Sequence, residues 1–351
     1  MTCIMADPEE LLPSPKIRIW RYLPILIVLG LAVYLLLPQI STLAQSWSVV
    51  HNMAWWAVAF AICAQILSYL SSGFMLRSIL EINQKKLSLW KGALITMASF
   101  SMGLVAGWVG GIASTYSWIR RENHDGNTAA MAVTLPALLN NGVLVGVSIT
   151  GTAYLMLVHD LTNTQLIEFG AVLLVLALIS VLILTALHYP TTGIRFSVWV
   201  TGRWAALRHK PFNPASTIAF VNQFVAAWNS LGKGKWRRPL LGAIANIVFD
   251  MLTLYFLFVA AGNNVSIGVL FAGYGLPIIL GKMAFLFPGG VGVIEGTMVA
   301  LYDSLKVPNS ISVVVILAYR LFSFWLPTLL GFVAAAFLSG KFFRTKKNRP
   351  E

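Results

Sequence analysis

Four ionisable side chains stand inside long apolar segments of this sequence. Asp250, Lys282, Glu295 and Arg320 are each flanked by runs of uncharged residues. A charge inside a membrane is costly and usually has a function, so these residues are candidates for binding a charged substrate. Since two are acidic and two are basic, the alternative is an internal ion-pair network that holds the chain together. The two roles are compatible.

Two glycine-rich turns interrupt apolar segments, at Gly107-Trp-Val-Gly-Gly111 and at Pro288-Gly-Gly-Val-Gly292. A helix that starts after such a turn has free N–H groups and a partial positive charge, which suit a phosphate or a carboxylate. Glu295, in the first turn of that helix, would also be stabilised there. Broken backbone at membrane depth must be buried or line a wet cavity, so we expect a cavity at the turns. The candidate site residues of the two turns are Gly110, Gly111, Pro288, Gly289, Gly290 and Gly292.

Three amide side chains also lie in apolar segments. Asn140 and Asn141 are adjacent, and in the register of the repeat described below they fall near the position of Arg320. We therefore expect them to contact a substrate. Amides in membranes often only join helices through hydrogen bonds, and this role is expected for Asn246.

Motifs of soluble enzymes and of metal sites are absent from the sequence. It has no GxSxG, P-loop or HExxH motif, and its two cysteines, Cys3 and Cys63, form no CxxC pair. We expect no cofactor, no metal site and no enzyme activity. An acid/base pair of Asp250 and Glu295 within the membrane stays open as an alternative.

The composition indicates the class of protein that must position these residues. Of 351 residues, 58% are hydrophobic and only 11% are charged, whereas soluble domains are about 25% charged. The mean hydropathy is +0.77. The net charge of +13 could indicate nucleic-acid binding, but the basic residues flank the apolar runs, as the positive-inside rule requires. The chain is predicted to be an all-α, polytopic membrane protein that binds no nucleic acid.

The apolar runs predict about six full spans and two re-entrant hairpins. The hairpins are expected at 88–119 and 267–305, because the glycine turns divide these segments. The piece 92–106 would be about 22 Å long as a helix, which is shorter than the hydrocarbon core of about 30 Å. The six spans are predicted at residues 20–38, 53–76, 129–157, 166–188, 239–261 and 311–338.

The distribution of positive charge supports the hairpins. With the N-terminus in the cytoplasm, the segment 189–238 reaches the cytoplasm only if 88–119 does not cross. That segment has eight Lys and Arg residues and no Asp or Glu, so the positive-inside rule places it there. From Ile218 its apolar residues recur at helical spacing, which predicts a helix along the membrane interface.

The predicted spans and hairpins form an inverted repeat. The unit 53–157 recurs with opposite orientation at 239–338, and inverted repeats with broken helices are typical of transporters. The predicted organisation is an N-terminal tail (1–19), a membrane domain (20–340) and a basic tail (341–351), with both termini in the cytoplasm.

Three motifs resemble a known family, the transmembrane flippase-like domain of lysylphosphatidylglycerol synthases, and its stand-alone YbhN-type inner-membrane proteins in particular. They are Phe287-Pro-Gly-Gly-Val-Gly-Val-Ile-Glu295, Ala318-Tyr-Arg-Leu-Phe-Ser-Phe-Trp-Leu-Pro327 and Trp108-Val-Gly-Gly-Ile112. The resemblance covers about residues 20–340. It implies that Glu295, Arg320 and the glycine turns are site residues.

The resemblance also implies a function in the inner (plasma) membrane, namely the movement of a lipid or a lipid-linked headgroup between leaflets. The expected partners are membrane lipids, anionic ones in particular. The alternative is a non-catalytic partner or scaffold of an enzyme of envelope lipid or glycolipid synthesis, which would bind the basic segment 189–238. A membrane enzyme that acts on a lipid headgroup is a third reading.

Overall fold

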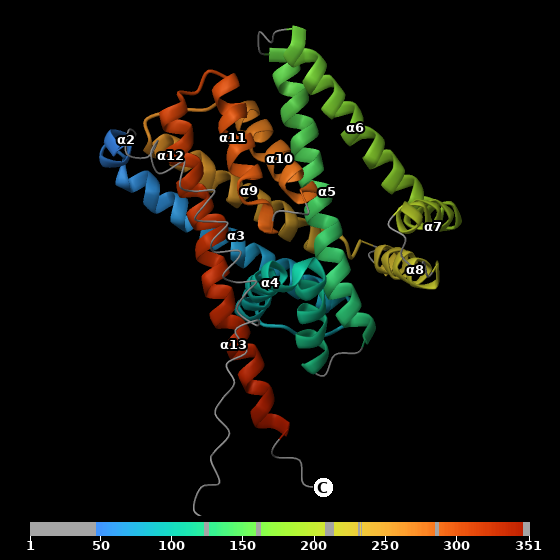
Figure 1. Ribbon diagram of the computed structural model, residues 1–351. Coiled ribbons are helices and arrows are strands. Elements are labelled where there is room, and N and C mark those ends of the chain that lie inside the picture. Colours follow the sequence, from blue (N-terminus) through green and yellow to red (C-terminus); the bar gives the residue numbers. More distant parts are fainter. Residues whose placement is uncertain are drawn as a thin grey trace, which may run out of the picture.

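Every regular element in the described part of the chain is a helix (Figure 1). The computed structural model describes residues 47–122, 126–158, 163–207, 214–230, 232, 234–284 and 288–346. The elements are α2 (Trp47–His51), α3 (Trp55–Ile82), α4 (Leu89–Arg121), α5 (Gly126–Val158), α6 (Asn163–His188), α7 (Pro190–Leu207), α8 (Pro214–Ser230), α9 (Arg237–Ala260), α10 (Ile267–Met283), η2 (Pro288–Gly290), α11 (Val293–Ser304), α12 (Asn309–Arg320), η3 (Leu321–Trp325) and α13 (Leu326–Lys346).

The prediction of an all-helical membrane bundle is confirmed. Four stretches are long and apolar enough to cross a bilayer, and they correspond to four of the six predicted spans. A fifth, predicted at 166–188, is the helix α6, whose apolar stretch is Phe169–Leu182. The first predicted span, at residues 20–38, lies outside the described residues. The four full-length stretches are Trp55–Ile82, Thr128–Val158, Arg237–Ala260 and Asn309–Ser339.

The first helices of the two units, α3 and α9, pack against each other over their whole length. The backbone N–H of Ala54, just before α3, donates to the carbonyl of Ala260 at the end of α9 (2.8 Å). Near the middle, Asn246 Nδ2 donates to the Ser68 carbonyl (2.9 Å). At the other end, a Cβ on Gly242 would lie only 2.8 Å from Met75 Cα. The order of these contacts shows that α3 and α9 run antiparallel.

The helix α4 turns back on itself. The Thr115 hydroxyl donates to the Ser99 hydroxyl (2.5 Å), although a straight helix would separate residues 16 positions apart by about 24 Å. A Cβ on Gly111 would also lie 3.4 Å from Gly103 Cα. The glycines let the two arms come this close. The segment is therefore a helical hairpin, as predicted.

The elements α10, η2 and α11 form the second hairpin. A Cβ on Gly281 in α10 would collide with the side chain of Ile294 in α11, and it would lie 3.7 Å from Gly290 Cα. The hairpins begin after α3 and after α9, and these helices are antiparallel. They therefore enter the bundle from opposite ends, as an inverted repeat requires (Figure 1).

Each hairpin packs against the last span of the other unit. The Ser101 hydroxyl of α4 donates to the Thr328 carbonyl of α13 (2.8 Å). Correspondingly, a Cβ on Gly151 of α5 would lie 2.8 Å from Phe271 Cβ of α10. This exchange joins the two units into one bundle and brings the hairpin tips to its centre.

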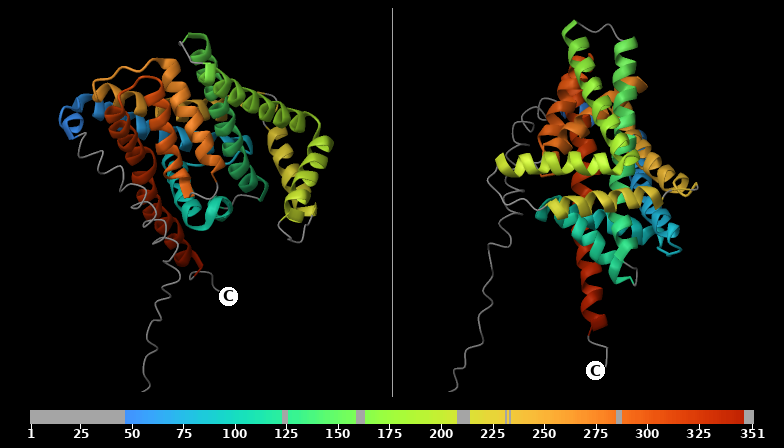
Figure 2. Two further views of the ribbon diagram at one scale, coloured as in Figure 1. Left: turned by 45° about the horizontal axis from the view of Figure 1, so that its top comes forward. Right: turned by 90° about the vertical axis from the view of Figure 1, so that its right-hand side faces the viewer.

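The helices α6, α7 and α8 lie beside this bundle. The right-hand view of Figure 2 shows α7 and α8 lying across the direction of α5, and α8 packs against both α7 and α5. The helix predicted from Ile218 is part of α8. The stretch 196–207, where Arg203 interrupts the apolar face, is also helical, as part of α7. The position of the membrane interface relative to these helices stays a prediction.

Candidate functional site

The turn of the second hairpin has a backbone that favours glycine. Gly289, Gly290 and Gly292 have φ values of 67°, 65° and 83°, and residues with side chains rarely adopt this left-handed region. The turn ends at Gly292, and α11 begins at Val293. Glu295 therefore lies in the first helical turn, as the sequence predicts.

Glu295 and Arg320 form a buried ion pair. Arg320 Nε donates to Glu295 Oε1 (2.6 Å), and their side chains are only 7% and 2% exposed. Glu295 Oε2 accepts the Gly292 N–H (2.7 Å), and Arg320 Nη2 donates to the Gly289 carbonyl (3.1 Å). The guanidinium also lies over the Phe324 ring, 4.2 Å from its centroid. The pair thus fastens the turn of the second hairpin to α12.

Asp250 lies in the middle of α9 and is held by two tyrosines. Its Oδ2 accepts the hydroxyls of Tyr274 and Tyr319, each at 2.8 Å. The Gln65 side chain of α3 also interacts with this carboxylate. Within the described residues no basic side chain lies within ion-pair distance of Asp250. The four-charge network proposed from the sequence therefore contains one direct ion pair in the structure, between Glu295 and Arg320.

Lys282 lies near the end of α10 and reaches across to the other unit. Its ammonium donates to Asn141 Oδ1 (2.7 Å), and no ion pair involves it among the residues that the structure places. The neighbouring Asn140 has a buried side-chain oxygen without a hydrogen-bond partner. Asn246 joins α9 to Ser68 of α3 through both the carbonyl and the hydroxyl, which is the joining role expected for it.

A cavity of about 1290 Å³ lies where the hairpin tips meet. A Cβ on Gly289 in the second tip would lie 3.0 Å from Leu104 Cδ2 in the first. Helices α3, α5, α9 and α12, the turn η3 and the start of α13 contribute the remaining walls. Of the sequence-predicted site residues, seven line this cavity, namely Gly111, Asn140, Asp250, Lys282, Gly289, Gly290 and Arg320.

The other predicted site residues take different positions. Glu295 and Asn141 bind the wall residues Arg320 and Lys282 without lining the cavity themselves. Gly292 binds Glu295, and Gly110 is outside the lining. The side chain of Pro288 lies outside the described part of the structure. Glu295 already binds Arg320 and the Gly292 N–H, so an anionic ligand at either group would compete with Glu295.

Several polar residues of the cavity were missed by sequence reasoning. They include Gln65 and Tyr69 of α3, Tyr274 of α10 and Tyr319 of α12. Gln65 has a buried oxygen without a partner. The sequence did contain a signal for Gln65 as a candidate site residue, because it is a glutamine within an uncharged run. The tyrosines gave none, since tyrosine is frequent in membrane proteins as an interface residue without a binding role.

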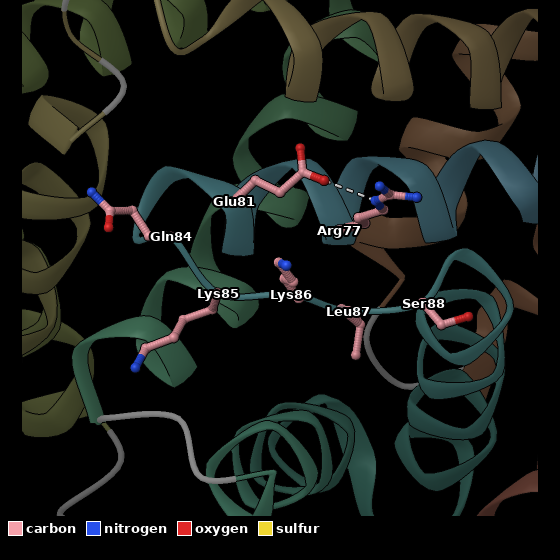
Figure 3. A pocket seen from close by; sticks show the side chains of 7 residues that line it. All are labelled: Arg77, Glu81, Gln84, Lys85, Lys86, Leu87 and Ser88. Carbon is pink, nitrogen blue, oxygen red and sulfur yellow. Dashed lines mark hydrogen bonds and ion pairs between the residues drawn. The ribbon is translucent and has the colours of Figure 1, made fainter.

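A second, basic pocket of about 600 Å³ lies at the loop between α3 and α4 (Figure 3). Its lining residues are Arg77, Glu81, Gln84, Lys85, Lys86, Leu87 and Ser88. Glu81 binds Arg77 (2.8 Å) and Arg238 of α9 (2.9 Å), so the pocket keeps an excess of positive charge. It lies at the end of the bundle where the first hairpin enters.

The described residues contain no cluster of three or more His, Cys, Asp or Glu side chains that could hold a metal ion.

Comparisons with known proteins agree with this architecture. Residues 22–331 match the family described as "Lysylphosphatidylglycerol synthase TM region". A UPF0104 membrane protein of Pyrococcus horikoshii is 30% identical over 120 residues, which are 32% of this chain and 33% of that protein. One of Methanocaldococcus jannaschii is 30% identical over 92 residues, 26% of this chain and 27% of that protein.

A UPF0104 membrane protein of Methanothermobacter thermautotrophicus is 30% identical over 87 residues, which are 25% of each chain. The matched stretches thus span a third or less of these relatives. The family match extends over most of the sequence and includes both hairpins. The chain belongs to the lysylphosphatidylglycerol synthase TM region family.

Proposed function

We propose that this protein moves a lipid, or a lipid-linked headgroup, between the leaflets of the plasma membrane. The observation that supports this most is the cavity at the meeting point of two hairpins that enter from opposite ends. Broken helices at the interface of inverted repeats form the substrate sites of many transporters. The two glycine turns supply that arrangement here.

The cavity suits a polar headgroup attached to apolar chains. Charged and amide side chains line its wall, among them Asp250, Lys282 and Asn140. Outward-facing side chains of the spans are large and apolar, such as Leu329 and Phe337 of α13. A headgroup would occupy the cavity while its acyl chains stay in the surrounding lipid. In this proposal the end of the bundle with the basic pocket faces the cytoplasm, as the positive-inside rule favours.

Purified protein in liposomes tests the proposal. A lipid with a fluorescent acyl chain is placed in both leaflets, and a membrane-impermeant reductant bleaches the outer one. Translocation is expected to expose the inner label, so that bleaching proceeds further than in protein-free liposomes. Equal bleaching with and without protein, for every lipid tried, would contradict the proposal.

A cavity-filling variant separates transport from leakage. Ala137 of α5 lines the cavity, so Ala137→Phe is expected to slow bleaching of the inner label at least several-fold. Gly142 of the same helix is exposed, and a Cβ there would meet nothing within 4 Å. Gly142→Phe is therefore the matched control and is expected to leave the rate unchanged.

A further inference from the structure

Asp250 is the one acidic side chain among the described residues that line the cavity. It lies in the middle of α9 and is partly exposed, so water in the cavity can reach its carboxylate. Arg320 acts on this carboxylate electrostatically, but its guanidinium donates to Glu295. Two acids thus share one cation at membrane depth, where carboxylates commonly take part in proton transfer.

The hydrogen bonds around Asp250 suit both of its protonation states. Both tyrosine hydroxyls donate to Oδ2, which leaves Oδ1 for a proton. The Gln65 side chain also interacts with this carboxylate, and its own oxygen is buried without a hydrogen-bond partner. Its NH₂ group faces the ionised carboxylate, because two oxygens would repel each other. After the amide turns over, its oxygen can accept the O–H of the protonated acid. The protonated state would therefore give the unpaired oxygen a partner.

The charged groups around Asp250 balance one another until a proton binds. Every helix that packs against α9 was considered, and α5 brings no charged side chain to the site. With Asp250 ionised, two positive and two negative side chains at the cavity sum to zero, and a proton on Asp250 makes the sum +1. An anion is therefore bound more strongly when Asp250 is protonated. The titratable and polar groups of this site are Gln65 and Tyr69 of α3, Tyr274 and Lys282 of α10, Glu295 of α11, and Tyr319 and Arg320 of α12.

We propose that Asp250 binds one proton in each transport cycle, so that a proton gradient drives the movement of an anionic headgroup. The inference rests on the proposed function and specifies its energy source. A hydronium ion in the cavity gives its proton to Oδ1, which forms an O–H bond and leaves water. On the other side of the membrane the proton returns to water. Because linkage is reciprocal, the proton and the anion strengthen each other's binding, and both cross in the same direction.

An imposed pH gradient in liposomes tests this coupling. The probe is phosphatidylglycerol with a fluorescent acyl chain, and the impermeant reductant measures its share in each leaflet. With an acidic exterior, the label is expected to accumulate at least several-fold in the inner leaflet relative to protein-free liposomes. A protonophore should abolish the accumulation. Translocation that ends with equal leaflets despite the gradient would overturn the inference and keep the proposed function. Accumulation driven by a sodium gradient in place of the pH gradient would also overturn it.

Infrared difference spectroscopy tests the proton site without requiring transport. Spectra of the detergent-solubilised protein are compared between mildly acidic and mildly alkaline pH, a range in which ordinary exposed carboxylates stay ionised. The wild type is expected to show the C=O stretch of a protonated acid at the lower pH, and Asp250→Asn is expected to lose it. The matched control is Asp303→Asn, which removes an exposed acid of α11 and should keep the band. A band that survives in Asp250→Asn would contradict the assignment.

Two variants join the proton site to transport. Asp250→Asn keeps an oxygen for the tyrosines but cannot exchange a proton, so the gradient should no longer drive accumulation of the label. If Asp250→Asn does not fold, Tyr319→Phe replaces it. This change removes a hydrogen bond that is stronger to the ionised carboxylate, so the acid band should persist to higher pH, and an unshifted band would contradict the site. A titrating Asp250 without translocation of any lipid would support the proton site and contradict the proposed function.

Discussion

Tyr319 and Arg320 are adjacent in the chain, and they bind two different carboxylates. Tyr319 donates to Asp250 on α9 (2.8 Å), and Arg320 donates to Glu295 on α11 (2.6 Å). The π-helical turn η3 follows directly, and such turns are frequent at functional sites. The Tyr69 hydroxyl lies 3.2 Å and 2.9 Å from the carbonyls of Phe322 and Ser323, within this turn. The end of α12 thus joins the hairpin turn, the charged site and α3.

The buried ion pair is expected to contribute strongly to stability. Glu295→Gln leaves the Arg320 charge buried without a counter-charge, which costs about 3–5 kcal/mol. Thermal unfolding of the detergent-solubilised protein should therefore begin at a clearly lower temperature. The double variant Glu295→Gln/Arg320→Met removes both charges and is expected to recover part of the loss.

An exposed ion pair provides the control for this prediction. Lys91 and Glu122 join the start and the end of the first hairpin, and their side chains are 36% and 37% exposed. Lys91→Gln is expected to cost about 0–1 kcal/mol. Equal effects of Glu295→Gln and Lys91→Gln on thermal unfolding would show that the buried pair has no special role.

Gly151 marks a contact between helices that a methyl group would disrupt. A Cβ there would collide with the backbone of α10 near Phe271 and Ala272, so Gly151→Ala should push the second hairpin away and destabilise the protein by about 1–3 kcal/mol. Gly146 lies in the same helix, with nothing within 4 Å of its Cβ position. Gly146→Ala is expected to be neutral or slightly stabilising in the same unfolding measurement. The reverse order would contradict the packing of α5 on α10.

The fold of the first hairpin can be trapped by a disulfide. In a background with Cys3 and Cys63 replaced by serine, Ser99→Cys/Thr115→Cys is expected to form an intramolecular disulfide, because the two hydroxyl oxygens lie 2.5 Å apart. Peptide mass spectrometry after mild oxidation detects the bond. The control Thr134→Cys/Thr150→Cys has the same spacing in the continuous helix α5 and should form none. Free thiols at both 99 and 115 would indicate that α4 does not turn back.

Much of the architecture could be predicted because apolar length and charge distribution are properties of the sequence. The segments that break at Gly107–Gly111 and at Pro288–Gly292 are the two that turn back in the structure. Glycine is needed in both turns for a physical reason. It lets the two arms of a hairpin come close together, and in the second turn it also allows the left-handed backbone. The four membrane charges were also found from the sequence, since charges are rare in such segments.

The pairing of these charges could not be predicted, because it depends on how distant helices pack. Glu295 and Arg320 meet through contacts over 25 positions, and Lys282 meets Asn141 over 141 positions. Tyr274 and Tyr319 could not be predicted as partners of Asp250, because nothing in the sequence distinguishes them from the other aromatic residues of the membrane segments. The chain remains helical through the point where α4 turns back. In the sequence, only the small residues there mark the position of the turn.

Opposite entry of the two hairpins is the claim on which the transport account depends most. Lys86 lies in the loop before the first hairpin and Asn264 in the loop before the second, and both side chains are exposed. Single cysteines at these positions, in the cysteine-free background, can be labelled with an impermeant maleimide in intact and in opened cells. The account predicts labelling of Asn264→Cys from outside and of Lys86→Cys only after the cytoplasmic side is opened. Labelling of both positions from the same side would contradict it.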